Sequence, residues 1–118
     1  MRLGDIMNLL EAELLNQRVD LDIELESAFA ADLMSDVLAL ARPGSLMITG
    51  LTNIQIMRTA SMIDMPAVVF VRGKKPPLET IELAGKLGIP FMITYKTMFE
   101  TCGLLYEAGI KPIRCEKR

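Results

Sequence analysis

Short apolar runs recur at a nearly constant spacing in the second half of the chain. They follow four prolines that lie 23, 24 and 22 residues apart, and only the first proline is separated from its run, by Gly44 and Ser45. Continuous apolar runs bounded by turn residues are typical of strands buried on both faces of a parallel sheet. We predict strands at Leu46–Thr49 after Pro43, Ala67–Val71 after Pro66, Phe91–Thr94 after Pro90, and from Ile113 after Pro112.

Helical patterns separate these runs, with apolar side chains recurring three or four positions apart. The helical positions are Ile54, Met57, Ala60 and Met62; Leu78, Ile81, Leu83, Ala84 and Leu87; and Phe99, Cys102, Leu105 and Tyr106. Gly88 and Gly109 stand where a residue in the left-handed conformation ends a helix. Repeated strand–loop–helix units imply right-handed crossovers, so we predict an α/β fold with a mainly parallel sheet built from βα units.

The first forty residues follow a different pattern. Asp5–Leu15 is predicted to be a short amphipathic helix, and the strict alternation of Asp20–Glu26 predicts a half-exposed strand that continues toward Ala30. Leu33–Ala41 is predicted to be a helix that Ser35 or Asp32 caps and Arg42-Pro43-Gly44 ends.

Composition narrows the functional classes. The 118 residues suit one compact domain, here residues 1–118, and 51% of them are hydrophobic. The chain has no histidine, which excludes Ser-His-Asp and Cys-His nucleophile pairs and histidine-containing zinc sites. Its two cysteines, Cys102 and Cys115, are too few for a four-thiolate site or a disulfide framework. We therefore expect no catalytic residues, no metal and no cofactor.

The same features bear on location and partners. Two free thiols are typical of a protein in the reducing cytoplasm. No apolar segment approaches the ~20 residues of a membrane span, and the amino-terminal residues show no signal-peptide pattern, so we expect a cytoplasmic location. The net charge of −2 conceals an asymmetry, because residues 1–60 carry −5 and residues 61–118 carry +3. A basic half can hold an anion pocket or a complementary dimer face. At a sequence pI near 5.1, nucleic acid is not an expected partner, whereas the high apolar content favours a homodimer.

Three loops follow predicted parallel strands and lead directly into predicted helices. In open parallel sheets, ligands bind beyond the carboxyl ends of the strands, near helix N-termini. The candidate anion-binding residues are Thr49, Gly50, Thr52 and Asn53; Arg72, Gly73, Lys74 and Lys75; and Thr94, Lys96 and Thr97. The alternative is that the loops hold capped helices with solvated lysines: Thr52 with Gln55 and Thr97 with Glu100 match capping boxes, and Pro76-Pro77 suits a helix start.

Other chemistries have weaker signals. No glycine is followed two residues later by another, which excludes the G-x-G-x-x-G fingerprint, and neither Gly-Lys pair has the upstream glycine of a Walker A loop. Cys102, about one turn into a predicted helix, suits a buried small hydrophobe better than an activated thiol. Asp32 and Asp36 are spaced to share a cation, but helix capping and solvation explain them as well.

Parts of the chain resemble a known family. Pro66-Ala67-Val68-Val69-Phe70-Val71-Arg72-Gly73-Lys74-Lys75-Pro76-Pro77, Ile81-Glu82-Leu83-Ala84, Gly88-Ile89-Pro90-Phe91 and Thr97-Met98-Phe99-Glu100-Thr101 resemble the DRTGG domain and the related N-terminal domain of HPr kinase/phosphorylase. Asp32–Ala39 and Thr49–Asn53 are similar to a branch found near iron-only hydrogenase genes. Leu51-Thr52 stands in place of the family's Asp-Arg pair, and Arg72-Gly73-Lys74 in place of its Thr-Gly-Gly.

The resemblance implies a three-layer α/β domain that acts as a regulatory or ligand-sensing module. Our first hypothesis is a non-catalytic module that binds a small anionic ligand, a nucleotide or a phosphorylated metabolite, at the loop edge. The alternative is a protein-interaction accessory of an iron-only hydrogenase or electron-transfer system. An enzyme using Cys102 as nucleophile is the third choice, and the absence of a P-loop argues against a kinase.

Overall fold

A six-stranded sheet forms the centre of the computed structural model, which describes residues 1–16 and 19–115. The strand order is β1-β5-β4-β3-β2-β6; β5, β4, β3, β2 and β6 are parallel, and β1 is antiparallel to β5. The strands are β1 (Glu13–Leu14), β2 (Ser27–Ala30), β3 (Leu46–Thr49), β4 (Val68–Phe70), β5 (Phe91–Ile93) and β6 (Lys111–Pro112).

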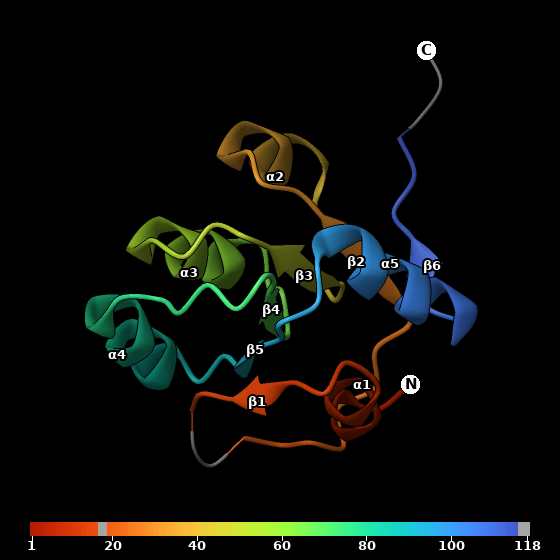
Figure 1. The fold of residues 1–118 in the computed structure, drawn as a ribbon. Helices are drawn as coiled ribbons and strands as arrows, with labels where there is room; N and C mark the ends of the chain where they lie inside the picture. The colour runs from red at the N-terminus through yellow and green to blue at the C-terminus, as the bar shows by residue number, and fades with distance from the viewer. Residues whose placement is uncertain (17–18, 116–118) are drawn as a thin grey trace.

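Helices cover both faces of this sheet. They are α1 (Leu3–Leu9), α2 (Met34–Leu40), α3 (Ile54–Met62), α4 (Leu78–Leu87) and α5 (Met98–Glu107). Figure 1 shows α2, α3 and α4 on one side of the sheet and α1 and α5 on the other. The predicted three-layer α/β fold with a mainly parallel sheet is confirmed.

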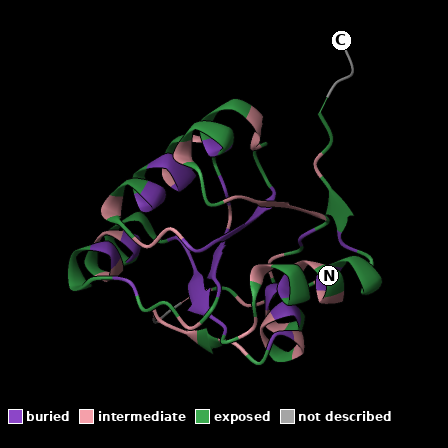
Figure 2. Cartoon of the chain, turned by 45° about the horizontal axis from the view of Figure 1, so that its top comes forward, coloured by how far each residue is buried: buried purple, intermediate pink, exposed green. Residues whose placement is uncertain are grey.

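The central strands are buried on both faces because their side chains alternate between two apolar cores. Ile48 and Val69 join the core beneath α1 and α5, whereas Met47, Val68 and Phe70 join the core beneath α2, α3 and α4. Figure 2 shows the central strands buried and the helices buried on their inner sides, whereas β2 is intermediate and the edge strands β1 and β6 are partly or fully exposed. Full burial stabilises each such side chain by about 1.5–3 kcal/mol, which explains the continuous apolar runs.

The predicted helices after these strands all form. Gly88 ends α4 in the left-handed conformation, with φ of 69°, and Gly109 after α5 also has a positive φ. In the described residues, no helix combines the length and apolarity needed to cross a membrane.

The amino-terminal prediction is partly wrong. The helix stops at Leu9 rather than Leu15, because Glu11 adopts a positive φ and Glu13–Leu14 instead form β1 against the edge of β5. An isolated helix pattern cannot reveal that this edge strand is available to pair with residues 13 and 14.

The predicted strand at Asp20–Glu26 is also not formed, and only Ser27–Ala30 joins the sheet there. The carbonyls of Leu21 and Ile23 instead accept hydrogen bonds from the backbone N–H groups of Gly4 and Leu3, both at 2.9 Å. These donors lie in the first turn of α1, where no intrahelical partner exists. The alternating segment therefore caps a helix instead of pairing along a strand.

Candidate functional site

The three predicted loops meet at one edge of the sheet. Because β3, β4 and β5 are parallel neighbours, their carboxyl ends lie side by side, and each continues into α3, α4 or α5. The loop of β3 is tied to α4 by the buried hydroxyl of Thr80, which donates to the carbonyl of Thr52 at 2.9 Å. The fold therefore brings the sequence-predicted residues of three loops to a single edge.

Arg72, after β4, is bound by a carboxylate that follows a more distant strand. Its Nη1 donates to Oδ2 of Asp32 at 3.2 Å, and Oδ1 of Asp32 accepts from the backbone N–H of Gly50 at 2.6 Å. Asp32 follows β2, so the ion pair crosses the end of β3. The prediction that Asp32 or Ser35 caps α2 is wrong: Leu33 is the N-cap residue, without a side-chain hydrogen bond.

Gly50 lies beneath this ion pair. A Cβ at Gly50 would lie 3.0 Å from both Cζ of Arg72 and Oδ1 of Asp32. The lack of a side chain there lets the guanidinium pass over the end of β3. Sequence reasoning placed Arg72 and Gly50 in the site but missed Asp32 as their partner; its position just after a predicted strand was the available signal.

The chain turns sharply between β4 and α4 at Arg72 and Gly73. Both have positive φ, 61° and 65°, and the N–H of Lys74 donates to the carbonyl of Val71 at 3.3 Å, as in a type I′ turn. Two further hydrogen bonds, Arg72 N to Lys96 O at 2.9 Å and Gly73 N to Thr94 O at 2.8 Å, bind the turn to the loop after β5. The turn is therefore fixed by its neighbour.

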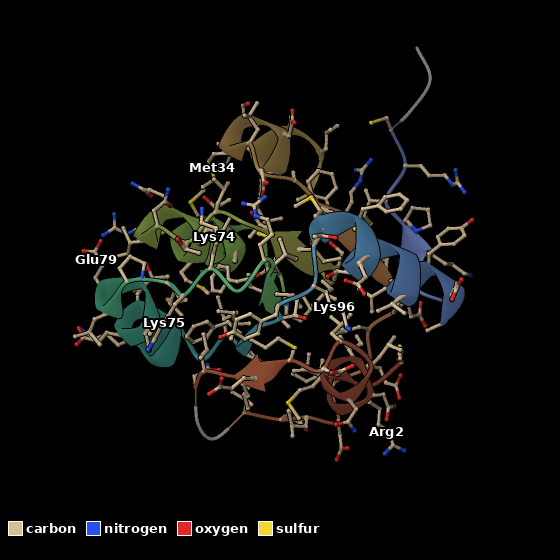
Figure 3. The ribbon with its side chains drawn as sticks, viewed as in Figure 1. Arg2, Met34, Lys74, Lys75, Glu79 and Lys96 are labelled. Carbon is tan, nitrogen blue, oxygen red and sulfur yellow. The ribbon has the colours of Figure 1, made fainter. Side chains whose placement is uncertain are left out.

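Lys74 and Lys75 project from this turn without a counter-ion. Both are exposed, and in the described chain neither amine has a carboxylate oxygen within 4.0 Å. Figure 3 shows them on the segment that leads into α4. They are the two predicted cations that remain available to an anion.

Lys96 has a different environment. Its side chain is only 20% exposed, and its Nζ lies 3.6 Å from a carboxylate oxygen of Glu11 and 3.8 Å from one of Glu100. Two carboxylates thus face one ammonium, an arrangement that disfavours a further anion. In Figure 3, Lys96 lies apart from Lys74 and Lys75, toward α1.

The predicted threonines mostly hold the loops in place. The buried Thr94 hydroxyl donates to the carbonyl of Leu10 at 2.7 Å and accepts from Lys96 N, and the buried Thr49 hydroxyl accepts from Leu51 N at 3.0 Å. These hydroxyls bind backbone groups, which explains their presence without a ligand.

The two predicted capping boxes have different outcomes. Thr97 caps α5 by accepting from Glu100 N at 3.3 Å, but the Glu100 carboxylate pairs with Lys96. The Thr52–Gln55 box is not formed: Asn53 is the N-cap residue of α3, and its side chain makes no capping bond. Pro77 is the N-cap residue of α4, consistent with the predicted helix start.

Two hollows flank Tyr95, a residue that the sequence-based site omitted. One, of about 300 Å³, is lined by Leu10, Glu11, Thr94, Tyr95, Lys96 and Glu100. The other, of about 150 Å³, is lined by Glu13, Leu15, Gly73, Lys75, Ile93 and Tyr95. Tyr95 is 81% exposed, and two other aromatic residues, Phe99 and Tyr106, are exposed as well.

Cys102 is half-buried, and this burial raises the pKa of its thiol. A raised pKa lowers the thiolate fraction, which is the opposite of activation. In residues 1–16 and 19–115, no cluster of three or more cysteines and carboxylates is placed to hold a metal ion, and Asp32 is engaged by Gly50 and Arg72.

Comparison with known proteins adds a family and a fold. The family model described as the DRTGG domain matches residues 5–108. A crystal structure of the CBS and DRTGG domains of the regulatory region of Clostridium perfringens pyrophosphatase, complexed with its activator diadenosine tetraphosphate, is similar, with a TM-score of 0.71 and 20% sequence identity. The match covers 95% of this chain and 48% of that one, so the chain spans about half the length of the regulatory region. None of the curated proteins matches the chain.

Proposed function

Because the chain belongs to the DRTGG domain family, we propose that residues 1–118 are a single non-catalytic regulatory module that binds a small anionic ligand at the carboxyl edge of the sheet. The ligand class is a nucleotide or another phosphorylated metabolite. The observation that carries this proposal is that Lys74 and Lys75, on a turn fixed between the starts of three helices, have no carboxylate partner among residues 1–16 and 19–115.

One of the three helix starts at this edge favours negative charge, whereas α4 and α5 carry an acidic side chain, Glu79 and Glu100 respectively, in their first turns. Residues 54–62 form a helix with no acidic side chain in its first turn and no side-chain cap at Asn53, so the positive end of its dipole is not neutralised from within. The bond from Thr80 to the Thr52 carbonyl keeps this helix start beside α4. Arg72 adds a third cation that an anion reaches by competing with Asp32.

One comparison and one property of the chain support the regulatory assignment. The similar pyrophosphatase region is regulatory and holds a nucleotide with four phosphates, which makes such a compound the first probe. Burial raises the pKa of the Cys102 thiol, which argues against Cys102 as an activated nucleophile. We also propose that the module is related to the N-terminal domain of HPr kinase and that it is located in the cytoplasm.

Calorimetry and thermal shift with diadenosine tetraphosphate, ATP and inorganic tripolyphosphate test the proposal. The double variant Lys74→Ala/Lys75→Ala should bind at least tenfold more weakly than the parent, because two charge-assisted contacts are lost. The matched control is Lys86→Ala/Lys111→Ala, which removes two exposed lysines elsewhere. Failure of all three compounds to bind the parent, or equal loss in both double variants, would refute the site.

One observation favours the second function, an accessory that binds a protein of a hydrogenase or electron-transfer system. The same observation favours a homodimer, in which a second copy of the chain binds. An apolar hollow of about 260 Å³ lies between β2 and α5, lined mainly by apolar side chains that include Ala28, Ala30, Ile48 and Leu105. All four residues of β2 are only half-buried. Sedimentation tests the homodimer directly, and a monomer at high concentration would contradict it.

A further inference from the structure

We propose that Tyr95 is the platform on which the base of a nucleotide stacks, so that the ligand of the carboxyl edge is a nucleotide rather than a non-aromatic phosphate compound. This inference rests on the proposed function, because it identifies the class of ligand held by Lys74 and Lys75. It is carried by the position of the Tyr95 ring and by the composition of the smaller hollow beside it.

The ring of Tyr95 is exposed but packed against the backbone. A Cβ at Gly73 would lie 2.6 Å from both Cδ1 and Cε1 of Tyr95, so the ring rests directly on the turn that carries the two lysines. Its chain neighbours are fixed as well, since Thr94 is hydrogen-bonded on both sides and Lys96 O accepts from Arg72 N. Such a ring offers a π-face to a planar ligand with little further loss of conformational freedom.

The 150 Å³ hollow matches part of a nucleotide. It is smaller than the roughly 300–1,000 Å³ of sites that enclose whole ligands, so it can receive one ring system only. Tyr95, Ile93 and Leu15 give it apolar walls, and Lys75 and Glu13 give it one cation and one carboxylate. An uncharged base with amino or imino donors suits such a lining better than a bare phosphate does.

The two charged residues also fix the direction of the ligand. The carboxylate of Glu13 repels a phosphate but accepts hydrogen bonds from base N–H groups. Lys75 lines the hollow and attracts the phosphates, and Lys74 precedes it on the same turn segment. The base therefore lies toward Glu13 and the phosphates toward the turn. The larger hollow on the other side of Tyr95 lacks this division, because its only cation, Lys96, is already paired with Glu11 and Glu100.

Binding of ATP and of inorganic tripolyphosphate to four proteins tests the inference. Tyr95→Ala should weaken ATP about tenfold, in line with the loss of one base–aromatic stack, and leave tripolyphosphate unchanged. Tyr95→Phe should retain the parent affinity for both compounds. Tyr106→Ala, which removes an exposed tyrosine from α5, is the matched control and should also behave like the parent.

Tyrosine fluorescence gives a second readout, because the chain has two tyrosines and no tryptophan. In Tyr106→Phe, ATP should quench the remaining Tyr95 emission and tripolyphosphate should not; the same titration of Tyr95→Phe corrects for absorption by the base. ATP binding that depends on Lys74 and Lys75 but is equal in Tyr95→Ala and the parent would overturn this inference alone. Absence of any binding to the parent would overturn both this inference and the proposed function. If Tyr95→Ala abolished a dimer but left the ATP affinity unchanged, the ring would belong to an interface between two copies, and the inference would also be overturned.

Discussion

Asp32 and Arg72 form an ion pair of 3.2 Å between the ends of two strands that are not neighbours. Strand β3 lies between them, and the guanidinium crosses its end above Gly50, whose N–H binds the other oxygen of the same carboxylate. One carboxylate thus joins the ends of β2, β3 and β4. Both partners are about half-exposed, so the pair organises the edge more than it stabilises the fold.

Gly50→Ala should disturb this arrangement. The new methyl group would contact the guanidinium and the Asp32 carboxylate at about 3 Å, which forces Arg72 away. We expect the free energy of unfolding to fall by about 1 kcal/mol, the sum of a weak exposed ion pair and a strained hydrogen bond. Urea denaturation measures it. In an Arg72→Ala background the same substitution should cost less, and equal costs in the two backgrounds would show that Arg72 does not lie over Gly50.

The positive φ of Arg72 predicts an unusual order of substitutions. Arg72→Ala and Arg72→Gly both lose the ion pair, but only glycine relieves the left-handed conformation at φ of 61°. Arg72→Gly should therefore be more stable than Arg72→Ala by about 1 kcal/mol in urea denaturation. At Lys74, which does not have a positive φ, alanine should be at least as stable as glycine. An order at Arg72 like that at Lys74 would contradict the turn.

Two buried threonines should respond oppositely to the same change. Thr94→Val leaves the Leu10 carbonyl and the Lys96 N–H without their partner and should destabilise the protein by about 1–3 kcal/mol. Thr101→Val removes a buried hydroxyl that has no hydrogen-bond partner in the described part of the chain, and should be neutral or stabilising by up to about 1 kcal/mol. Thermal and urea unfolding measure both. Destabilisation by Thr101→Val comparable to that by Thr94→Val would show that the hydroxyl has a partner.

Cys102 should react slowly with alkylating reagents. Burial raises the pKa of its thiol, so at pH 8 the folded chain holds less thiolate at this position than the unfolded chain does. In a Cys115→Ser variant, iodoacetamide should modify folded Cys102 more slowly than denatured Cys102, with a rate that rises above the ordinary thiol pKa of about 8.5. Since the folded state holds the proton more tightly, this group's stabilising contribution is complete below that pKa and is lost as the pH rises through the raised one. Equal rates in the folded and denatured chains would contradict the burial.

The repeated βα units could be predicted because their strands are buried on both faces. Val68, Val69 and Phe70 must all be apolar when consecutive side chains enter two different cores, and this requirement is visible in the sequence alone. The amino-terminal segments could not be predicted in the same way. Residues 13 and 14 join β5, and residues 21 and 23 cap α1, through partners that are distant in sequence and leave no local pattern.

The candidate site also has one part that the sequence predicts and one part that depends on residues distant in sequence. Its loops follow predictable strand ends, so the sequence alone is enough to assign Gly50, Arg72 and Thr94 to one edge of the sheet. The charge balance could not be predicted, because it depends on which strands lie near one another: Asp32 reaches Arg72 across β3, and Glu11 reaches Lys96 from the segment after α1. Tyr95 was missed because the spacing of hydrophobic residues predicts burial in helices and strands, but does not predict whether an aromatic side chain in a loop is exposed.

The pairing of the edge strands has a kinetic consequence. Neighbouring central strands join residues about 20 positions apart, as in Ala28 with Leu46 and Met47 with Val68, whereas β1 and β6 pair Glu13 with Ile93 and Ser27 with Lys111 across 80 or more. Closing a longer loop costs more chain entropy, and this entropy is lost before the contact between the strands can offset it. The four central strands should therefore assemble early during folding, and the two edges should dock last and detach first.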